Sequence, residues 1–438
     1  MILRLFRASM MLTLCAVVAA ATLAAGNATF RVIYTNQGYG PGAGLIEGSR
    51  GVFYSTAGSG PVAAISVTVQ GLMTILANFP GGNFESPLIS GPNGRFYSSL
   101  YTGVYNVFSV TSAPNGERSY PAQSIGVILL QNLPDGTLLG AGGNYPDGLW
   151  RLVRCGLDGA LTSFTTFPAG QRIENAMYAS DGNFYGVTLG SDVVPGSTSY
   201  VFRATPSGAL TTLYTFPLNT FTQYSSTPLL FAHDGNLYGS TATGGTNGTG
   251  MIYKLTLDGQ FTLLHSFEKG KFPAGPTTLI EASDGNLYGD AQSYVTAGQL
   301  FRITKSGQYT PLYDMRASSA ACPCWLVQGS DGIIYGMAAV GGTVNHGAVF
   351  ALDVGLTRPG PQAQSFSPQS GAEGTDVRIW GHNLLSAVIQ FNGVSATTVL
   401  NSGSNYVWAK VPAGATTGPI TVTTPGGTDT TQASFTVQ

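Results

Sequence analysis

Residue types that can do chemistry are scarce in this sequence. Aspartate, glutamate, lysine and arginine make up only 9% of its 438 residues, and there are four histidines and four cysteines. Two carboxyl groups brought together from distant parts of the chain could hydrolyse a glycosidic bond. The loop acids without an evident structural role are Glu85, Glu174, Asp192, Glu268 and Asp290. The sequence contains no HExxH, G-x-S-x-G or P-loop motif.

The histidines do not form a ligand or catalytic pattern. His233 stands at a turn position that is serine in three other repeats, which favours an exposed structural residue. His265 replaces the Tyr214 of a neighbouring repeat and is expected to pack. His346, in the loop GGTVNHGAVF, is the histidine at an expected binding edge. We therefore expect no metal and no cofactor.

The cysteines do not form a metal-ligand pattern either. Without an N-terminal leader the chain keeps Cys155, Cys322 and Cys324, and an odd number leaves at least one thiol outside intramolecular pairing. The segment ACPCW has C-x-C spacing, with no nearby histidine or acid to complete a metal site. We expect either a small strained disulfide or two packed thiols there.

The N-terminus has the features of an export signal. Arg4 and Arg7 precede an apolar stretch over residues 10–25, and small residues follow near Gly26 and Ala28. We expect residues 1–28 to be a signal peptide, and the mature chain to be extracellular, at the cell surface or periplasmic. An uncleaved anchor is less favoured because the stretch is short for a bilayer. Lipid attachment at Cys15 is disfavoured by the large residue Leu14 before it.

One short pattern, exemplified by HDGNLYG, recurs along the chain. Aligned copies carry their aromatic or leucine residue at Tyr54, Tyr97, Leu139, Tyr185, Tyr238, Tyr288 and Tyr335. Their spacing runs from 42 residues (Tyr97 to Leu139) to 53 residues (Tyr185 to Tyr238). This period is typical of propeller blades.

Each copy contains four apolar runs separated by Gly-rich turns, as in TPLLFA, NLYGST, MIYKLTL and FTLLHSF. Asp-Gly between such runs indicates antiparallel hairpins. One carboxylate per copy favours a turn over a calcium loop. We therefore predict an all-β chain with a seven-bladed β-propeller of four-stranded blades over residues 29–354. The last copy has three runs, so we expect Thr29–Thr35 to complete its blade.

The repeats resemble an exported bacterial family, the Gloeobacter/Verrucomicrobia-type repeats. The resemblance is strongest over residues 175–342, as in GGTNGTGMIYKLTLDGQFTLLHSF, and weaker in the first three copies. It implies a propeller and a secreted setting. It implies no catalytic residues.

The C-terminal residues follow a different pattern. After a linker at 355–363, residues 364–438 resemble an IPT/TIG domain, which implies an immunoglobulin-like β-sandwich acting as an adhesive or spacer module. The residues that carry this resemblance, besides the run ITVTTPGG, are Pro368, Gly371, Gly374, Gly381, Phe391, Asn392, Gly393, Val411, Pro412 and Gly418. Short alternating strands favour a sandwich independently. The only basic residues there are Arg378 and Lys410, and the net charge is −2, so we expect no nucleic-acid partner.

Blade topology restricts where a ligand could bind. The first–second and third–fourth turns of each blade are short and uniform, whereas the loops on the other face are long and unequal. Binding residues concentrate on variable loops. The candidates are Phe84, Glu85, Tyr101, Tyr105, Tyr145, Arg172, Glu174, Asp192, Tyr224, Lys271, Phe272, Asp290, Tyr294, Arg316 and His346. Aromatic rings beside neutral polar groups suit sugars or peptides.

These observations favour an exported, non-catalytic and monomeric protein that binds a surface polysaccharide or a protein partner. The alternative is a propeller enzyme acting on polysaccharide, with acids from separate blades. A third hypothesis is an architectural spacer. We expect no membrane span in the mature chain.

Overall fold

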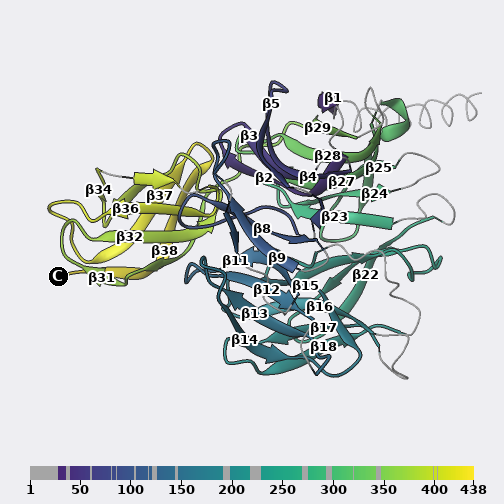
Figure 1. Ribbon diagram of the computed structural model, residues 1–438, viewed down its shortest axis with the longest axis horizontal. Helices are drawn as coiled ribbons and strands as arrows, with labels where there is room; N and C mark the ends of the chain where they lie inside the picture. Colours follow the sequence, from purple (N-terminus) through teal and green to yellow (C-terminus); the bar gives the residue numbers. More distant parts are fainter. Residues whose placement is uncertain are drawn as a thin grey trace, which may run out of the picture.

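The structure is a computed structural model and is almost entirely β (Figure 1). The residues that it describes are 28–35, 40–59, 62–79, 81–84, 86–102, 105–116, 118–120, 126–143, 147–190, 198–217, 228–268, 275–292, 298–318, 320–341, 347–397, 399–401 and 403–438. Apart from the short 3-10 helix η1 (Met315–Ala317), every element in these ranges is a strand. No helix among them has the length and apolarity of a membrane span. The predicted signal peptide lies outside these residues, except for Ala28.

The repeats form antiparallel sheets in which consecutive strands pair in order, except that β6 and β7 both pair with β8. The first two contain β2 (Gly40–Ser49), β3 (Val52–Ser59), β4 (Val62–Thr68) and β5 (Met73–Phe79), then β6 (Asn83–Phe84), β7 (Ile89–Ser90), β8 (Phe96–Tyr101), β9 (Tyr105–Val110) and β10 (Arg118–Tyr120). The next two contain β11 (Val127–Asn132), β12 (Leu138–Gly142), β13 (Arg151–Cys155) and β14 (Leu161–Thr166), then β15 (Gln171–Tyr178), β16 (Phe184–Gly190), β17 (Tyr200–Ala204) and β18 (Leu210–Thr215). The following two contain β19 (Leu230–Phe231), β20 (Leu237–Thr241), β21 (Met251–Leu255) and β22 (Phe261–Ser266), then β23 (Gly275–Glu281), β24 (Leu287–Gln292), β25 (Gln299–Ile303) and β26 (Tyr309–Asp314).

The last repeat sheet joins the two ends of the repeat region. It contains β27 (Ala320–Gln328), β28 (Ile334–Gly341) and β29 (Ala348–Asp353), and β1 (Thr29–Thr35) pairs antiparallel with β29, as the sequence predicts. The first and last sheets also pack together, because β2 contacts β27 and the ring of Phe53 lies 4.3 Å from that of Tyr335. Apolar clusters between neighbouring sheets form the core of this region.

The repeated Asp and Tyr are joined by a hydrogen bond. The hydroxyl of Tyr238 donates to Asp234 Oδ2 at 2.8 Å, while Asp234 Oδ1 accepts the amide of Asn236 at 3.2 Å. The same bond recurs at 2.6, 3.0 and 2.7 Å in the pairs Tyr185–Asp181, Tyr288–Asp284 and Tyr335–Asp331. The glycine after each aspartate has positive φ, which glycine adopts without steric cost. The repeated motif is therefore a turn fastened to a buried ring.

A second set of bonds links each such turn to the next sheet. Glu281 accepts the backbone amide of His233 at 2.9 Å, and Gln328 accepts that of Ser283 at 2.9 Å. Glu47 accepts that of Ser330 at 2.7 Å, across the junction of first and last sheets. A polar side chain of a first strand thus accepts a turn amide of the preceding sheet.

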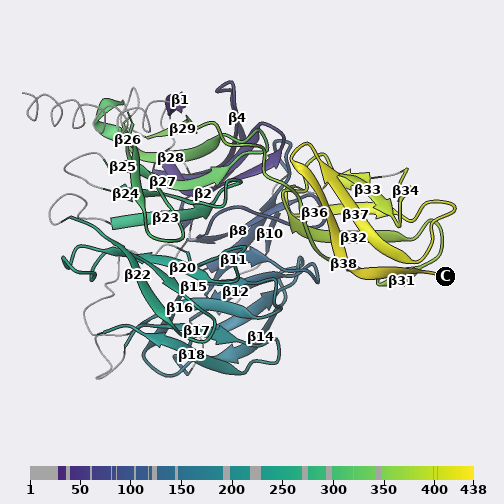
Figure 2. The same ribbon diagram turned by 180° about the vertical axis from the view of Figure 1, so that it is seen from behind.

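The C-terminal residues form two further sheets that enclose one apolar core. One contains β30 (Gln362–Ser367), β32 (Asp376–His382), β36 (Tyr406–Lys410) and β35 (Val399–Asn401). The other contains β31 (Ser370–Gly371), β38 (Gly427–Val437), β37 (Gly418–Thr424), β33 (Val388–Phe391) and β34 (Val394–Ser395). β30 begins two residues before the predicted boundary at 364. Figures 1 and 2 both place these sheets at one end of the molecule, beside the repeat sheets.

We expect the Tyr185–Asp181 bond to stabilise its turn measurably. Tyr185→Phe and Asp181→Ala should each lower the free energy of unfolding by about 1–2 kcal/mol, because the hydroxyl bonds a carboxylate. A double-mutant cycle by urea denaturation should show that the two losses are not additive. Additive losses would contradict a direct bond.

Candidate functional site

The C-terminal sheet β30-β32-β36-β35 is buried on both faces. Val377, Ile379, Val407 and Ala409 belong to the core of the C-terminal region. Alternate residues on the same strands point the other way, because side chains of a strand alternate between its faces. These residues are Arg378, Trp380, Tyr406 and Trp408, and they contact the repeat sheets.

Three of the four contacts are hydrogen bonds to turn carbonyls, and the fourth joins two rings. The hydroxyl of Tyr406 donates to the carbonyl of Leu133 at 2.6 Å, and the indole of Trp408 donates to that of Pro92 at 2.8 Å. Arg378 donates to the carbonyl of Pro134 at 2.9 Å. The ring of Trp380, 1% exposed, meets Tyr178 edge-on at 5.8 Å. The C-terminal region is therefore docked on the face of the short turns.

The docked surfaces leave a crevice with two cavities, of about 660 and 650 Å³. Both volumes fall in the range of small-molecule sites, about 300–1,000 Å³. Residues that line both are Leu230, Phe231, His233, Gln362 and His382. We call this space the interface crevice. It is our candidate functional site because repeat and C-terminal residues line it together.

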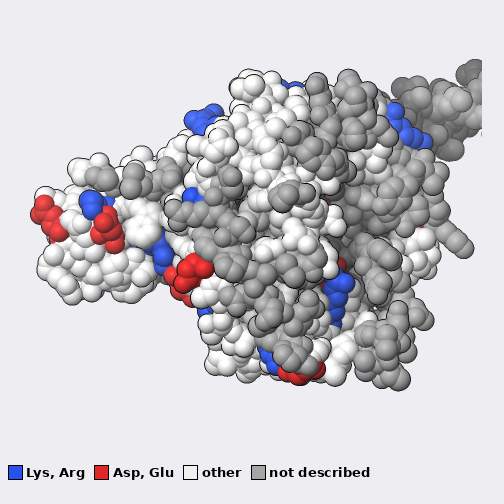
Figure 3. Space-filling view, viewed as in Figure 1, with Lys and Arg blue, Asp and Glu red and all other residues white. Residues whose placement is uncertain are grey.

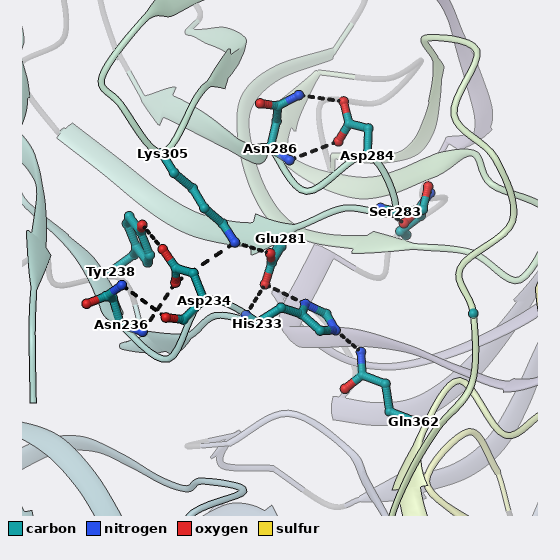
Figure 4. A network of polar contacts seen from close by, with 12 residues as sticks. His233, Asp234, Asn236, Tyr238, Glu281, Ser283, Asp284, Asn286, Lys305 and Gln362 are labelled. Carbon is teal, nitrogen blue, oxygen red and sulfur yellow. Dashed lines mark hydrogen bonds and ion pairs between the residues drawn. The ribbon is translucent and has the colours of Figure 1, made fainter. Parts of the chain in front are cut away.

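A polar network includes His233 and Gln362, which line both cavities (Figure 4). His233 Nδ1 lies 2.8 Å from Glu281 Oε2, and its Nε2 lies 2.7 Å from the amide nitrogen of Gln362. Lys305 Nζ lies 2.5 Å from Glu281 Oε1 and 3.9 Å from Asp234. In a neutral imidazole whose Nε2 accepts from the Gln362 amide, the proton is on Nδ1 and faces Glu281. His233 thus bridges the repeat region and the C-terminal region.

The charges in this network balance one another. Burial of Glu281, whose side chain is 5% exposed, opposes its ionisation, but bonds from His233 and Lys305 outweigh burial and lower its pKa. The bond to Glu281 raises the pKa of His233. Burial, with His233 nearby, lowers the pKa of His382 to about 4, so His382 is neutral at pH 7.

On the face shown in Figure 3, charged residues form small separate groups.

The loop-face candidates that the structure describes lie apart from the crevice lining. Tyr101 ends β8 and is 39% exposed, whereas Phe84 in β6 packs against Phe79 and Phe108. Arg172, over the ring of Trp150, lies 3.9 Å from Glu174 on β15, and burial raises the pKa of Glu174. Arg316, in η1, is paired with Asp314.

The remaining loop-face candidates lie outside the described residues. They are Glu85, Tyr145, Asp192, Tyr224, Lys271, Phe272, Tyr294 and His346, together with the side chain of Tyr105. The prediction that the long-loop face carries the binding residues therefore remains a prediction.

Asp290 is not the loop acid that the sequence suggested. It lies inside β24, is 0% exposed and accepts a bond from Thr277 at 2.8 Å. Burial raises its pKa to about 7, against the bonds from Thr277 and Thr278 that favour the charged form. The neighbouring Cys322 and Cys324 are buried and form no disulfide, and neither does the buried Cys155. Of the two outcomes expected for the C-x-C segment, the structure has the two packed thiols.

Sequence reasoning missed the interface crevice. His233 is a bridging residue, although its position in a turn suggested only an exposed substitution. A signal was present, because DVRIWGH and YVWAK place Arg378, Trp380, Tyr406 and Trp408 opposite the apolar core positions. Outward aromatic residues on a sandwich indicate a covered surface. His265, by contrast, stacks on Tyr309 at 4.0 Å, which confirms the prediction that it packs.

The docking bonds lead to a proteolysis prediction. The double variant Tyr406→Phe, Trp408→Phe removes two bonds to turn carbonyls while keeping most apolar contact. Each lost bond costs about 1 kcal/mol, so cleavage within residues 354–361 by a protease under native conditions should rise about tenfold or more. Tyr309→Phe, which loses a bond to Gln299 within one repeat sheet, is the matched control. If the double variant and the control were cleaved at the same rate, these bonds would not hold the C-terminal region on the repeat sheets.

Asp290 leads to a prediction about pH. Its pKa rises from the ordinary 3.8 to about 7 on folding, so between those values the folded chain binds more protons than the unfolded chain. The free energy of unfolding should fall across this window by roughly 2–4 kcal/mol as pH rises. Asp290→Asn should remove this fall in urea denaturation series. If the free energy of unfolding changed with pH in the same way in the wild type and in Asp290→Asn, the raised pKa of Asp290 would be contradicted.

Comparisons with known proteins agree on the fold. A streptogramin B lyase structure has a TM-score of 0.56 at 16% identity, covering 75% of this chain and 99% of that chain. The catalytically inactive virginiamycin B lyase from Staphylococcus aureus with quinupristin gives 0.56 and 16%, covering 75% and 100%. The extracellular domain of a hybrid two-component system from B. thetaiotaomicron gives 0.52 at 9%, covering 93% and 57%. At these identities the likeness concerns the fold alone.

No curated protein matches the sequence. A family model described as the Gloeobacter/Verrucomicrobia repeat matches residues 171–405, more than half of the chain. The repeat sheets, their fastened Asp-Gly turns and the similar solved structures agree with that match, and the fold is a β-propeller. The chain belongs to the Gloeobacter/Verrucomicrobia repeat family.

Proposed function

We propose that this protein is an exported, non-catalytic binding protein that recognises a surface polysaccharide or a protein partner. In this proposal residues 1–28 are a signal peptide, residues 29–354 a seven-bladed propeller, 355–363 a linker and 364–438 an IPT/TIG-type, immunoglobulin-like sandwich. The sheets that begin at β2, β6, β11, β15, β19, β23 and β27 support the blade count. The pairing of β1 with β29 supports a closed ring. The mature chain acts as a monomer.

The observation that carries the proposal is the interface crevice. Residues of the repeat region and of the C-terminal region line it together. The hydrogen bonds from Tyr406 to Leu133 and from Trp408 to Pro92 hold the two regions in place. Its acids serve structural contacts: Glu281 binds His233 and Lys305, and Asp429 accepts the amide of Ala363 at 2.7 Å. Such a site suits recognition, because preorganised walls reduce the entropic cost of binding. In this proposal the sandwich forms part of the binding unit.

The test is whether a polymer is bound and recovered intact. The full mature chain from Thr29 would be applied to an array of glycans and cell-wall polymers. Bound polymers would then be incubated with the protein and sized by chromatography. We expect retention with unchanged chain length. Shortened polymer would overturn the non-catalytic proposal.

The alternative is a propeller enzyme acting on polysaccharide. The chain shares its fold with lyase structures, and this supports the scaffold of the alternative alone. Burial raises the pKa of Asp290 to about 7, but its side chain is 0% exposed. If polymer is shortened, Asp290→Asn and Glu174→Gln should each be compared with wild type. A loss of cleavage of about 100-fold or more in either variant would favour this alternative.

A further inference from the structure

The two cavities of the interface crevice have a lining that selects against charged ligands. In the larger cavity, the lining holds one carboxylate, Asp429, two histidines, and no lysine or arginine. In the smaller one, Lys305 and Glu281 neutralise each other at 2.5 Å. An anionic ligand would have to give up its hydration without a free cation to replace it. A cationic ligand would find the lining acids already engaged.

The neutral polar groups of the lining can exchange hydrogen bonds with hydroxyls. Gln364 Oε1 is buried, and it has no hydrogen-bond partner among the described residues. A buried acceptor without a partner costs free energy, which a ligand donor would relieve. Gln432 lines the same cavity, and its amide has both donors and an acceptor. Sugar hydroxyls also act as both donors and acceptors.

The apolar groups of the lining lie beside these amides. Leu229, Leu230 and Phe231 line the larger cavity together with Tyr178, and Phe231 reaches the smaller cavity as well. Aromatic and aliphatic side chains can pack against the apolar ring faces of a sugar. The two cavities adjoin each other, because both are lined by His233 and Gln362.

We propose that the interface crevice binds a neutral oligosaccharide chain. The proposal rests on the balanced charges of the lining, the unpartnered oxygen of Gln364 and the apolar side chains beside it. This inference rests on the proposed binding function and names its ligand class. Gln364 donates and accepts from the C-terminal wall, while Tyr178 and Phe231 form the apolar wall on the propeller side. The His233–Gln362 bridge sets the position at which the chain passes between the cavities.

The test measures binding of the full mature chain to three named sets of oligosaccharides by calorimetry. The neutral set is cello-, xylo- and β-1,3-gluco-oligosaccharides. The anionic set is oligogalacturonates, and the cationic set is deacetylated chitosan oligomers. We expect binding within the neutral set alone, with affinity unchanged between low and high salt, because screening weakens only charged contacts.

Two variants test whether the ligand binds in the interface crevice. Gln364→Ala should weaken binding about five- to tenfold, the loss of one hydrogen bond. Ser180→Trp, at an exposed turn position lining the larger cavity, should abolish binding by filling the space. The matched controls are Gln390→Ala, half-buried on the other C-terminal sheet, and Ser207→Trp, at an exposed turn between β17 and β18. Both should bind as wild type, and thermal unfolding should confirm that all four variants fold.

The outcomes separate this inference from the proposed function. Neutral binding that is insensitive to Gln364→Ala and Ser180→Trp would overturn the crevice site but leave the binding function intact. Binding confined to the anionic or cationic set would overturn the ligand class. Retention of a protein partner alone, without any oligosaccharide, would overturn this inference and retain the proposed function. Cleavage of the oligosaccharides would overturn the proposed function itself.

Discussion

The turn closed by a buried tyrosine hydroxyl is the constraint on which the rest of the structure depends. In the pair Asp234–Tyr238, one carboxylate oxygen holds the turn and the other holds a fully buried ring of the following strand. The turn and the core are thereby fixed to each other. The C-terminal sheets dock on turns of the second and third repeats, where Trp408 and Tyr406 donate to the carbonyls of Pro92 and Leu133. These two turns differ from the others, because Asn93 donates to Tyr97 in one and Leu139 replaces the tyrosine in the other.

Two adjacent strands of the C-terminal region show how one sequence pattern serves two interfaces. β32 and β36 send Ile379 and Val407 into their own core and Trp380 and Tyr406 towards the propeller. The large aromatic residues bury apolar area, while their polar ends bond turn carbonyls. Because the two surfaces do not match everywhere, cavities remain beside the contact. The interface crevice thus lies where a C-terminal sheet docks on the turns of the repeat sheets.

Several acids of the described residues make structural contacts within the repeat region. Asp234 and its equivalents hold turns, and Glu47 and Glu281 connect neighbouring sheets. A carboxylate that accepts several short bonds has little remaining capacity to act on a substrate. Asp290 differs, since burial keeps its pKa near 7, but it is enclosed in the core. This distribution supports recognition over hydrolysis as the function of the crevice.

The sequence by itself determined the local structure. Asp-Gly turns, strand alternation and the repeat period are properties of neighbouring residues, so the hairpins and the pairing of Thr29–Thr35 with the last sheet could be predicted. The packing of His265 followed from its place in the repeat. The burial of Asp290 could not be predicted, because the depth of a strand residue depends on which sheets pack beside it. Nor could the role of His233, since Gln362 reaches it from 129 positions away. Only the tertiary structure decided which face the C-terminal sheets cover, because that choice depends on the match of two complete surfaces.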